Sequence, residues 1–434
     1  MQFRAVKGMN DILPDQIERW QRLEAAFRRV VELYGYAEVR TPVVERTELF
    51  VRSIGEATDV VEKEMYTFER HEESLTLRPE GTASAARAYV EHSVHAREPV
   101  SRWYYLGPMF RAERPQRGRY RQFYQAGCEV YGDPGPAADA EMIDMLCQLF
   151  TELGIGQLDV GINSIGGAAS RQRYREALLD YLRPKASTLS PHAQARLESN
   201  PLRILDSKDP RDQEAARGAP SILEVLDPDD RTHFEKLRVG LDALGTPYRV
   251  DPSLVRGLDY YTRTVFEIRS AMGELGAQNT LAAGGRYDTM VEGLGGPSVA
   301  AIGFAMGLER ILLAMPAAEE PKLPFCFVAP IGERAQAEGL RLARELRRLG
   351  VRTEVDARDR SIKSRLRRAD AAGARVCVLF GDAELDRGVV QLKDLAQHSQ
   401  EEVPLEGAPV LVAERVRAVT PEATTAELTT GGGD

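Results

Sequence analysis

The sequence predicts a mixed α/β protein with more than one domain. Its 434 residues exceed a single ordinary domain of roughly 100–200 residues. Residues 103–131 are rich in aromatics and predict two strands joined by a charged loop. Residues 325–381 alternate between strand and helix patterns, which is typical of a separate small domain with a mostly parallel sheet.

The composition is that of an ordinary globular chain. Hydrophobic residues make up 43% and charged residues 28%, which is enough apolar surface for a sizeable core. A net charge of −9 argues against a nucleic-acid packaging protein, although local basic patches can still bind nucleic acid. The four cysteines include no CxxC pair, so we expect neither a structural zinc site nor a disulfide framework. Without a signal peptide or a long apolar stretch, a soluble cytoplasmic protein is expected.

The first elements are a helix and an extended segment. Residues 15–34 carry apolar residues at three- and four-residue spacing, and Asp15 with Glu18 is expected to cap this helix. Residues 36–44 are extended, and Pro42 confines that strand to an edge or an end.

The charged loop between the two aromatic strands carries five arginines in eleven residues: Arg111, Arg114, Arg117, Arg119 and Arg121. Planar guanidinium groups fit phosphate oxygens, but charge alone does not separate this function from a solvated basic hairpin. The following strand favours a site, because Phe123, Gln125 and Glu129 share one face. An aromatic ring, an amide and a carboxylate beside such a loop indicate a nucleotide pocket with a polar cosubstrate.

In the middle of the chain the sequence pattern changes first to helix and then back to strand. Residues 168–250 are polar, helical and rich in turns, which predicts an insertion. Residues 254–268 and 280–287 return to strand patterns, and 296–315 run from a small-residue strand into a helix that contains Arg310. That arginine, taken alone, could be an ordinary surface residue.

Two short segments in this region are unusual. Arg256, Asp259, Tyr260 and Tyr261 crowd together before a strand, although a tyrosine pair is more often core and the other two could form a salt bridge. The paired glycines of AAGGRYD, at 282–288, permit close backbone approach.

Beyond a linker at 316–324, the α/β alternation begins. Its segment ARDRSIKSRLRRAD carries six basic residues between Arg358 and Arg368, which fits either a phosphate backbone or a solvated helix face. The last residues, ATTAELTTGGGD, are expected to be disordered.

Taken together, these segments resemble the class II aminoacyl-tRNA synthetases. GYAEVRTPVV, FRAER with RYRQFYQAGCE, and GFAMGLERILL are similar to motifs 1, 2 and 3 of that class, in the same order. RGLDYYTRTVFE and AAGGRYD resemble the two histidine-specific motifs of the histidyl-tRNA synthetases. KGMNDILP, LRPEGTASAARA, ERPQRGRYRQF and NPLRILDSKD also look like that family, so the resemblance covers about residues 1–420.

The resemblance implies a fold and a division of the chain. The fold is an antiparallel class II sheet flanked by helices, with a helical insertion and a C-terminal α/β anticodon-binding domain. The implied division is catalytic core 1–167 and 254–316, insertion 168–253, linker 317–324, anticodon-binding domain 325–420 and tail 421–434.

The resemblance also implies an ATP site. Arg111 is expected at the α-phosphate, where it steadies the transition state, and Arg310 at the γ-phosphate. Glu113 is expected on the adenine side and Phe123 against the ring. Arg119 and Arg121 complete the implied ATP-binding set, with Mg²⁺ accompanying ATP.

The implied histidine site lies beside it. Glu80 and Thr82, with Gln125, are expected at the α-amino group, and Gly81 and Tyr260 belong to the same pocket. Glu129 and Tyr261 are expected at the two imidazole nitrogens. Arg256 is expected near the carboxylate and the α-phosphate, where it neutralises developing charge in place of a metal ion.

The implied reaction has two steps and requires tRNA(His) as a partner. Histidine is first activated to the adenylate, and the tRNA then takes the histidine. Arg114 and Gln116 are expected to contact the extra 5′ guanosine of histidine tRNAs, and the enzyme is expected to be a homodimer.

Two rival interpretations come from the same resemblance. One is the catalytically silent regulatory subunit of ATP phosphoribosyltransferase, whose members typically lack the anticodon domain and have degraded histidine motifs. The other is a class II synthetase for another amino acid, against which RGLDYY and Glu129 argue.

Overall fold

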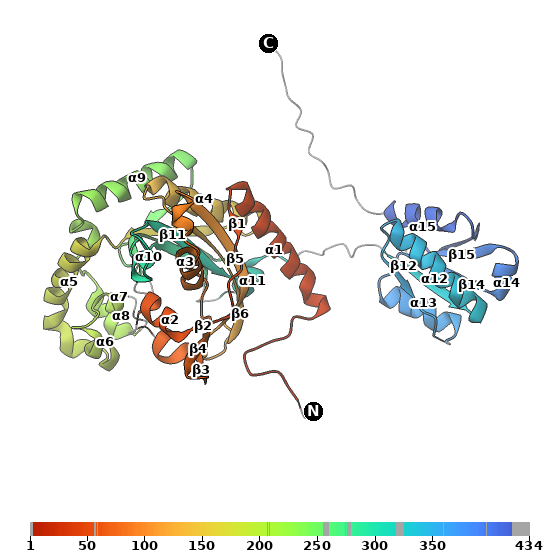
Figure 1. The fold of residues 1–434 in the computed structure, drawn as a ribbon, viewed down its shortest axis with the longest axis horizontal. Helices are drawn as coiled ribbons and strands as arrows, with labels where there is room; N and C mark the ends of the chain where they lie inside the picture. The colour runs from red at the N-terminus through yellow and green to blue at the C-terminus, as the bar shows by residue number, and fades with distance from the viewer. Residues whose placement is uncertain are drawn as a thin grey trace, which may run out of the picture. The chain divides into compact units, whose positions relative to one another are not determined.

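The computed structural model divides the chain into two compact units, Met1–Ala317 and Ala318–Asp434, which are described separately (Figure 1). It describes residues 3–55, 58, 60–205, 207, 209–254, 260–273, 275, 279–317, 325–358, 360–395 and 397–418. Most of the predicted linker, and the predicted tail at 421–434, lie outside these residues.

An eight-stranded sheet forms the centre of the first unit, in the order β1-β5-β6-β11-β10-β9-β7-β8. Its strands are β1 (Ala37–Glu38), β5 (Ser101–Phe110), β6 (Gln122–Tyr131), β7 (Leu158–Ser164), β8 (Arg249–Val250), β9 (Thr262–Ser270), β10 (Thr280–Arg286) and β11 (Ala301–Gly307). Neighbours from β5 to β7 are antiparallel, whereas β1 and β8 pair in parallel at the two edges. The aromatic hairpin predicted over 103–131 is therefore confirmed as β5 and β6.

Helices cover one face of this sheet (Figure 1). They are α1 (Pro14–Leu33), α4 (Pro136–Glu152), α9 (Pro228–Leu244) and α11 (Leu308–Ala314). The alternation of β6 explains the arrangement, because Ala126, Cys128 and Val130 join the core under these helices. The residues between them on β6 consequently face the other side of the sheet.

The predicted first helix is confirmed, but its predicted cap is wrong. Trp20, Leu23 and Phe27 are buried along α1, as their spacing indicates. The helix begins at Pro14 with no side-chain cap, because proline at the first position needs no hydrogen bond to its nitrogen. Asp15 instead lies within the first turn, where a negative charge suits the helix dipole.

Smaller elements lie on the other side of the sheet from this helical layer. A three-stranded sheet consists of β2 (Val44–Arg46), β3 (Tyr66–Arg70) and β4 (Glu73–Leu77), and the accompanying helices are α2 (Thr47–Ile54), α3 (Thr82–Glu91) and α10 (Met290–Gly293). The strand predicted over 36–44 is divided between two sheets, with β1 before Pro42 and β2 after it.

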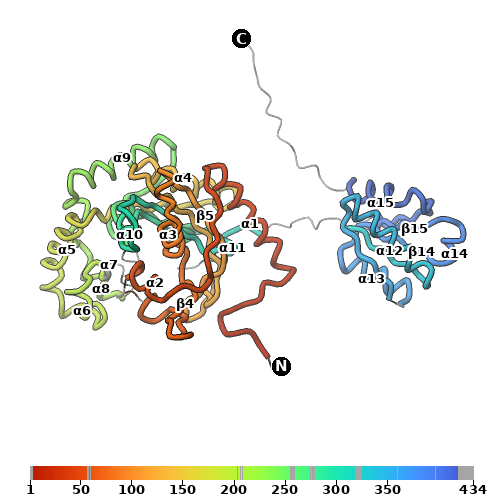
Figure 2. Tube along the Cα trace, in the orientation of Figure 1, coloured from red at the N-terminus to blue at the C-terminus, as the bar shows by residue number. Residues whose placement is uncertain are grey.

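The helical character predicted for 168–250 is confirmed for most of that stretch. It contains α5 (Ala168–Leu182), α6 (Pro191–Arg196), α7 (Leu202–Leu205), α8 (Pro210–Ala216) and α9. The tube in Figure 2 shows α5 to α8 gathered together, and they share a hydrophobic cluster of their own. The end of the stretch belongs to the main core, since α9 packs on α4 and β8 pairs with β7.

The second unit is an α/β domain with the sheet order β13-β12-β14-β15-β16. Its elements are β12 (Cys326–Ile331), α12 (Glu333–Arg348), β13 (Thr353–Val355), α13 (Ile362–Ala371), β14 (Val376–Gly381), α14 (Asp382–Asp386), β15 (Val389–Asp394), β16 (Ser399–Pro404) and α15 (Ala408–Arg417). The first three strands are parallel, as predicted, and β15 and β16 add an antiparallel hairpin. Separate hydrophobic clusters hold α12 and α15 on one face and α13 on the other.

Candidate active site

A cavity of about 410 Å³ opens on the face of the main sheet opposite α1 and α4. Small residues of β10 and β11 line its centre: Ala283, Gly303, Ala305 and Gly307. They share one face because Ala283 pairs with Ala305 and alternate residues of a strand point the same way. These short side chains leave the sheet open, so a ligand can lie directly against the strands.

Three arginines line this cavity, namely Arg111, Arg119 and Arg310. Nε of Arg111 donates to the carbonyl of Pro79 at 2.9 Å, and the guanidinium lies 5.5 Å from the centre of the Phe123 ring. Burial, and then the charge of Arg119, lowers the pKa of Arg310. Guanidinium groups that converge in this way fit a ligand with several phosphate oxygens.

Glu113 lines the same part of the cavity and pairs with Arg119, with 3.2 Å between its Oε2 and Nη1 of the arginine. Arg310 approaches the carbonyls of Gly118 and Thr280, each at 3.4 Å. Arg310 is thus held between the hairpin loop and β10, and the structure brings it to the same cavity as Arg111 and Arg119.

Two other arginines of the loop between β5 and β6, Arg114 and Arg121, do not line the cavity. Nε of Arg121 donates to the carbonyl of Glu113 at 3.2 Å. Arg114 and Gln116 are exposed near the tip of the loop. The carbonyl of Gly8 accepts from the backbone N–H of Arg121 at 2.7 Å, so the N-terminal segment braces the loop.

Glu129 is fully buried and adjoins the cavity floor. A Cβ atom added at Gly303 would meet its carboxylate, so the glycine leaves room for it. The hydroxyl of Tyr287 donates to Oε2 of Glu129, and the hydroxyl of Tyr105 donates to Oε1 at 3.2 Å. Burial raises the pKa of Glu129 to about 8, against the lowering effect of these donors. Strongly shifted, desolvated carboxyl groups of this kind cluster at functional sites.

This carboxyl group should make the protein less stable at high pH. Burial raises the pKa of Glu129 from 4.5 to about 8, so the folded state favours the protonated form. The contribution of this protonation to the free energy of unfolding is fully present below pH 4.5, and it is lost as the pH rises through about 8. Each unit of pKa separation corresponds to about 1.4 kcal/mol. Glu129→Gln should therefore gain melting temperature relative to wild type at about pH 9 but not at about pH 4.5. Equal shifts at both pH values would show that this carboxyl group does not titrate on unfolding.

Glu80 caps the helix α3 from just before its start. Its two carboxylate oxygens accept from the backbone N–H groups of Thr82 and Ala83, each at 2.8 Å. Burial raises its pKa, although these hydrogen bonds oppose the shift. Glu80 and Thr82 both line the cavity, so capping and ligand binding can share this carboxylate, which has further lone pairs.

Gln125 also lines the cavity and is tied to the same turn. Its Oε1 accepts from the backbone N–H of Gly81 at 3.1 Å. The amide nitrogen of Gln125 then points away from that contact. Gly81 itself does not line the cavity and contributes only its backbone.

Tyr260 and Tyr261 both line the cavity, with 4.5 Å between their ring centres. Tyr260 also lies edge-on to Tyr287, at 5.7 Å between the rings. The carbonyl of Tyr261 accepts from Nη1 of Arg171 on α5 at 3.1 Å. Arg256 and Asp259, which precede this pair, lie outside the described residues.

Sequence reasoning assigns no role to three residues of this site. Tyr287 stands in the AAGGRYD segment, where the paired glycines are the more unusual feature. Tyr105 lies in an aromatic run with no distinguishing spacing. Glu267 lines the cavity and accepts from Thr280 Oγ1 at 2.5 Å, and the alternation of its strand is the only signal for it in the sequence.

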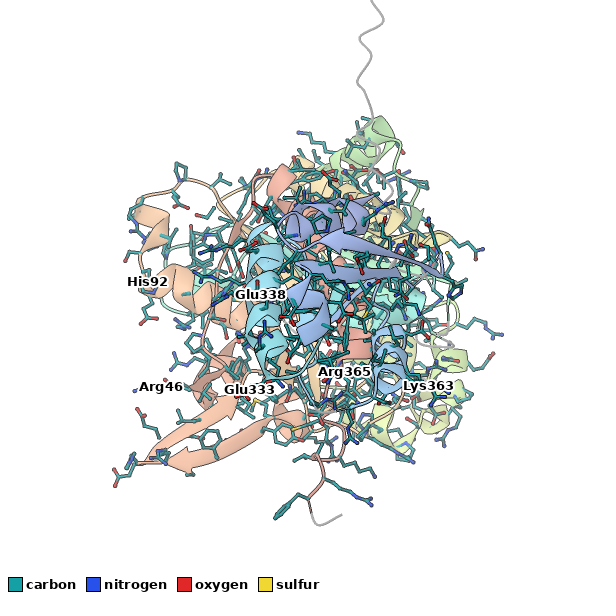
Figure 3. All side chains as sticks on the ribbon, turned by 90° about the vertical axis from the view of Figure 1, so that its right-hand side faces the viewer. Arg46, His92, Glu333, Glu338, Lys363 and Arg365 are labelled. Atoms are coloured by element: carbon teal, nitrogen blue, oxygen red, sulfur yellow. The ribbon has the colours of Figure 1, made fainter. Side chains whose placement is uncertain are left out.

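The basic segment of the second unit is only partly available to a ligand. Figure 3 labels Lys363 and Arg365 on α13. Arg365 is buried, and its guanidinium donates to the carbonyls of Pro330, Asp356, Arg358 and Arg360. Arg358 and Arg368 both bond the carboxylate of Asp356. Five of the six basic residues are exposed, and only Arg365 is buried, so both interpretations of the segment stay open for the other five.

Within the described ranges, no group of three potential ligand residues could hold a metal ion. In the same part of the chain, no helix combines the length and apolar character needed to cross a membrane.

The antiparallel sheet, with arginines from the hairpin loop and from the helix after β11, is that of a class II aminoacyl-tRNA synthetase. A family model described as histidyl-tRNA synthetase matches residues 8–311, and one described as anticodon binding domain matches 326–415. The chain belongs to the histidyl-tRNA synthetase family.

Individual proteins agree with this assignment. A histidine–tRNA ligase of Sorangium cellulosum is 62% identical over 97% of this chain and 98% of its own length. One from Syntrophotalea carbinolica is 47% identical over 96% of this chain and its full length. The apo crystal structure of S. aureus histidyl-tRNA synthetase has a TM-score of 0.80 at 35% identity, covering 94% of this chain and 99% of that one.

Proposed function

We propose that this cavity binds ATP among its arginines and histidine beside its buried glutamate. The chain is a histidine–tRNA ligase, which activates histidine with ATP and joins it to tRNA. The observation that carries the proposed site is a pair of neighbouring environments: three guanidinium groups line the cavity, and beside it, against Gly303, lies a desolvated carboxyl group held by two tyrosine hydroxyls. ATP–pyrophosphate exchange with each of the twenty amino acids tests it, and only histidine should support exchange.

The roles proposed in the ATP subsite are those that the resemblance implies, and the clustering of the arginines supports them. Arg111 contacts the α-phosphate, Arg310 the γ-phosphate, and the adenine ring stacks on Phe123. Glu113 lies on the adenine side and Arg119 adds charge beside it. Arg121 joins this set only if the loop rearranges on binding, since its Nε now donates to a carbonyl of the loop.

The histidine subsite lies beside Glu129. Neutral imidazole has one donor and one acceptor nitrogen, which suit a carboxylate and a phenol, here Glu129 and Tyr261. Glu80, Thr82 and Gln125 take the α-amino group.

The remaining contacts of the subsite are less direct. Gly81 contributes through its backbone, and Tyr260 packs against the pocket wall. Arg256 is proposed at the carboxylate of histidine, where it stabilises charge that develops at the α-phosphate.

The reaction has two steps, and the groups named above act in the first of them. A carboxylate oxygen of histidine attacks the α-phosphorus of ATP, and the bond to the β-phosphate oxygen breaks, releasing pyrophosphate. A ribose hydroxyl at the tRNA 3′ end then attacks the carbonyl carbon of the adenylate, and AMP leaves with the bonding electron pair. The arginines supply fixed positive charge throughout the first step.

Mg²⁺ is proposed as the companion of ATP. It commonly binds through one or two carboxylates together with substrate phosphates, so a described pocket without a three-carboxylate cluster suits an ion carried in by ATP.

The enzyme is proposed to be a homodimer, because residues 35–44 resemble motif 1, a dimer-forming helix and strand. Val43 and Val44 support this, since they are 36% and 38% exposed there despite their apolar side chains. Sedimentation of the purified protein should give twice the chain mass. The proposed location of the enzyme is the cytoplasm, as expected from the sequence.

The domain division 1–167, 168–253, 254–316 and 325–420 is proposed with the linker at 317–324, and the end of the second segment, α9 and β8, packs into the catalytic core. Ending the chain after Ala317 should leave a soluble core that still makes histidyl-adenylate, because the cavity and its hydrophobic clusters lie within the first unit. Charging of tRNA should fall by about 10-fold or more through the loss of anticodon contacts. A truncated protein that cannot catalyse pyrophosphate exchange would contradict the proposed independence.

Arg114 and Gln116 are proposed to contact the extra 5′ guanosine of the tRNA, because both are exposed at the loop tip. Arg114→Ala should leave pyrophosphate exchange nearly intact, since no tRNA takes part in it. Aminoacylation of normal tRNA(His) should fall by about 10-fold, the effect of roughly 1.4 kcal/mol of lost transition-state contact. A tRNA lacking that guanosine should be harmed much less, and equal losses on both tRNAs would exclude this role.

The regulatory-subunit alternative is less well supported. An ATP phosphoribosyltransferase regulatory subunit/histidyl-tRNA synthetase of Bacillus halodurans shares the fold at 22% identity and a TM-score of 0.65. The anticodon-domain match and the ligase relatives favour the synthetase activity.

A further inference from the structure

Two glycines, Gly81 and Gly127, leave the space that the Tyr105 side chain fills. Tyr105 lies on β5, is 4% exposed, and pairs with Gly127 on β6. A Cβ atom at Gly127 would lie 2.4 Å from its hydroxyl oxygen, and one at Gly81 would lie 2.2 Å from its ring. Because any side chain at either glycine would displace the ring, both positions favour glycine and the ring is held in one place.

The hydroxyl of Tyr105 joins two parts of the histidine pocket. Its oxygen lies 3.2 Å from Oε1 of Glu129 and 3.4 Å from Oγ1 of Thr82. A phenol has one proton to donate, and an ionised carboxylate can only accept. When Glu129 is ionised, the proton of Tyr105 therefore goes to Glu129, and the hydroxyl of Thr82 lies within hydrogen-bond reach of both groups.

We propose that Tyr105 is a positioning residue that orients the Glu129 carboxylate for imidazole and couples it to Thr82. The inference rests on the proposed histidine subsite and deepens it. Tyr105 holds one carboxylate oxygen and Tyr287 holds the other, so the carboxylate cannot rotate without losing a hydrogen bond. The lone pairs that remain are fixed in direction, and they select a ring N–H donor.

Several titratable groups surround Glu129, namely Glu80, Tyr105, Tyr131, Tyr260, Tyr287 and Cys128. Burial and the charge of Glu80 raise the pKa of Glu129, whereas the hydroxyl of Tyr105 lowers it. Removing that hydroxyl should therefore raise the pKa further. The ionised form that accepts an imidazole N–H then requires a higher pH.

Tyr105→Phe tests the proposal, because it removes the hydroxyl and keeps the ring in its place. In histidine-dependent pyrophosphate exchange, the KM for histidine should rise by about 10-fold, as expected for a lost hydrogen bond to a charged group. The kcat and the KM for ATP should stay within about twofold. The inflection of kcat/KM for histidine should move to higher pH, which a purely structural defect does not produce.

Tyr104→Phe is the matched control. Tyr104 is the neighbouring residue, similarly buried, and its hydroxyl donates to Glu32 at 2.9 Å on the other face of the sheet. It should leave the histidine KM and the pH profile unchanged. A similar loss in both variants, or a wild-type pH profile with a wild-type histidine KM in Tyr105→Phe, would overturn the proposal.

Two further measurements distinguish failure of the positioning role of Tyr105 from failure of the proposed histidine subsite. Calorimetric titration with histidine at about pH 7 and about pH 9, on either side of the Glu129 transition, gives an affinity ratio that is independent of the amount of active enzyme. This ratio should change in Tyr105→Phe. If Glu129→Gln abolishes histidine activation while Tyr105→Phe behaves as wild type, only the positioning role fails. If Glu129→Gln also leaves the KM for histidine unchanged, the proposed subsite itself fails.

Discussion

Glu129→Gln should abolish most histidine-dependent pyrophosphate exchange while leaving ATP binding intact. The carboxylate is fully buried, and glutamine presents an amide that cannot accept from two tyrosines and an imidazole together. Losing a hydrogen bond to a charged group costs about 1.5–3 kcal/mol, so kcat/KM for histidine should fall by about 10- to 100-fold or more. Steady-state exchange with varied histidine, and separate titration with ATP, measure the two effects.

Glu32→Gln provides the control for this substitution. Glu32 accepts from Tyr104 on the helical face of the sheet, just as Glu129 accepts from Tyr105 on the cavity face. It should leave the histidine KM unchanged. An unaltered histidine KM in Glu129→Gln would remove Glu129 from substrate recognition and require another residue to read the imidazole.

Local periodicity is sufficient to predict the elements that flank the site. The spacing of Trp20, Leu23 and Phe27 defines α1, because a helix buries one stripe. The alternation of Phe123, Gln125 and Glu129 assigns three residues to one face of β6 from the order of the amino acids alone. In both cases the information lies within a single element.

The sequence alone does not predict which residues of neighbouring strands pair with each other. Tyr104 and Tyr105 are adjacent aromatics, and only the register of β5 against β6 shows which one faces the cavity. Arg365 is one of six basic residues in its segment, yet its carbonyl partners come from segments up to 35 residues away. Such roles depend on tertiary contacts, so composition and spacing could not separate them from their neighbours.

Arg111→Lys should reduce the rate of histidine activation by about 100-fold or more with little change in histidine binding. Arg111 is held by the carbonyl of Pro79 through Nε and lies beside the Phe123 ring, so its guanidinium is oriented before ATP arrives. Lysine retains the charge but lacks the planar fork and the Nε donor. Removing one preorganised donor to developing charge costs about 2.7–4 kcal/mol in comparable sites. The loss should appear in kcat for exchange, because the charge at the α-phosphate develops in the transition state.

Arg114→Ala is the control on the same loop. Arg114 is exposed at the tip, whereas Arg111 lines the cavity at the end of β5. If the loss of any arginine from the loop were the cause, the two substitutions would slow exchange to similar extents. If Arg111 acts at the α-phosphate, only its replacement slows exchange, and single-turnover measurement should place that loss in adenylate formation. A wild-type rate of adenylate formation in Arg111→Lys would show that another cation stabilises the transition state.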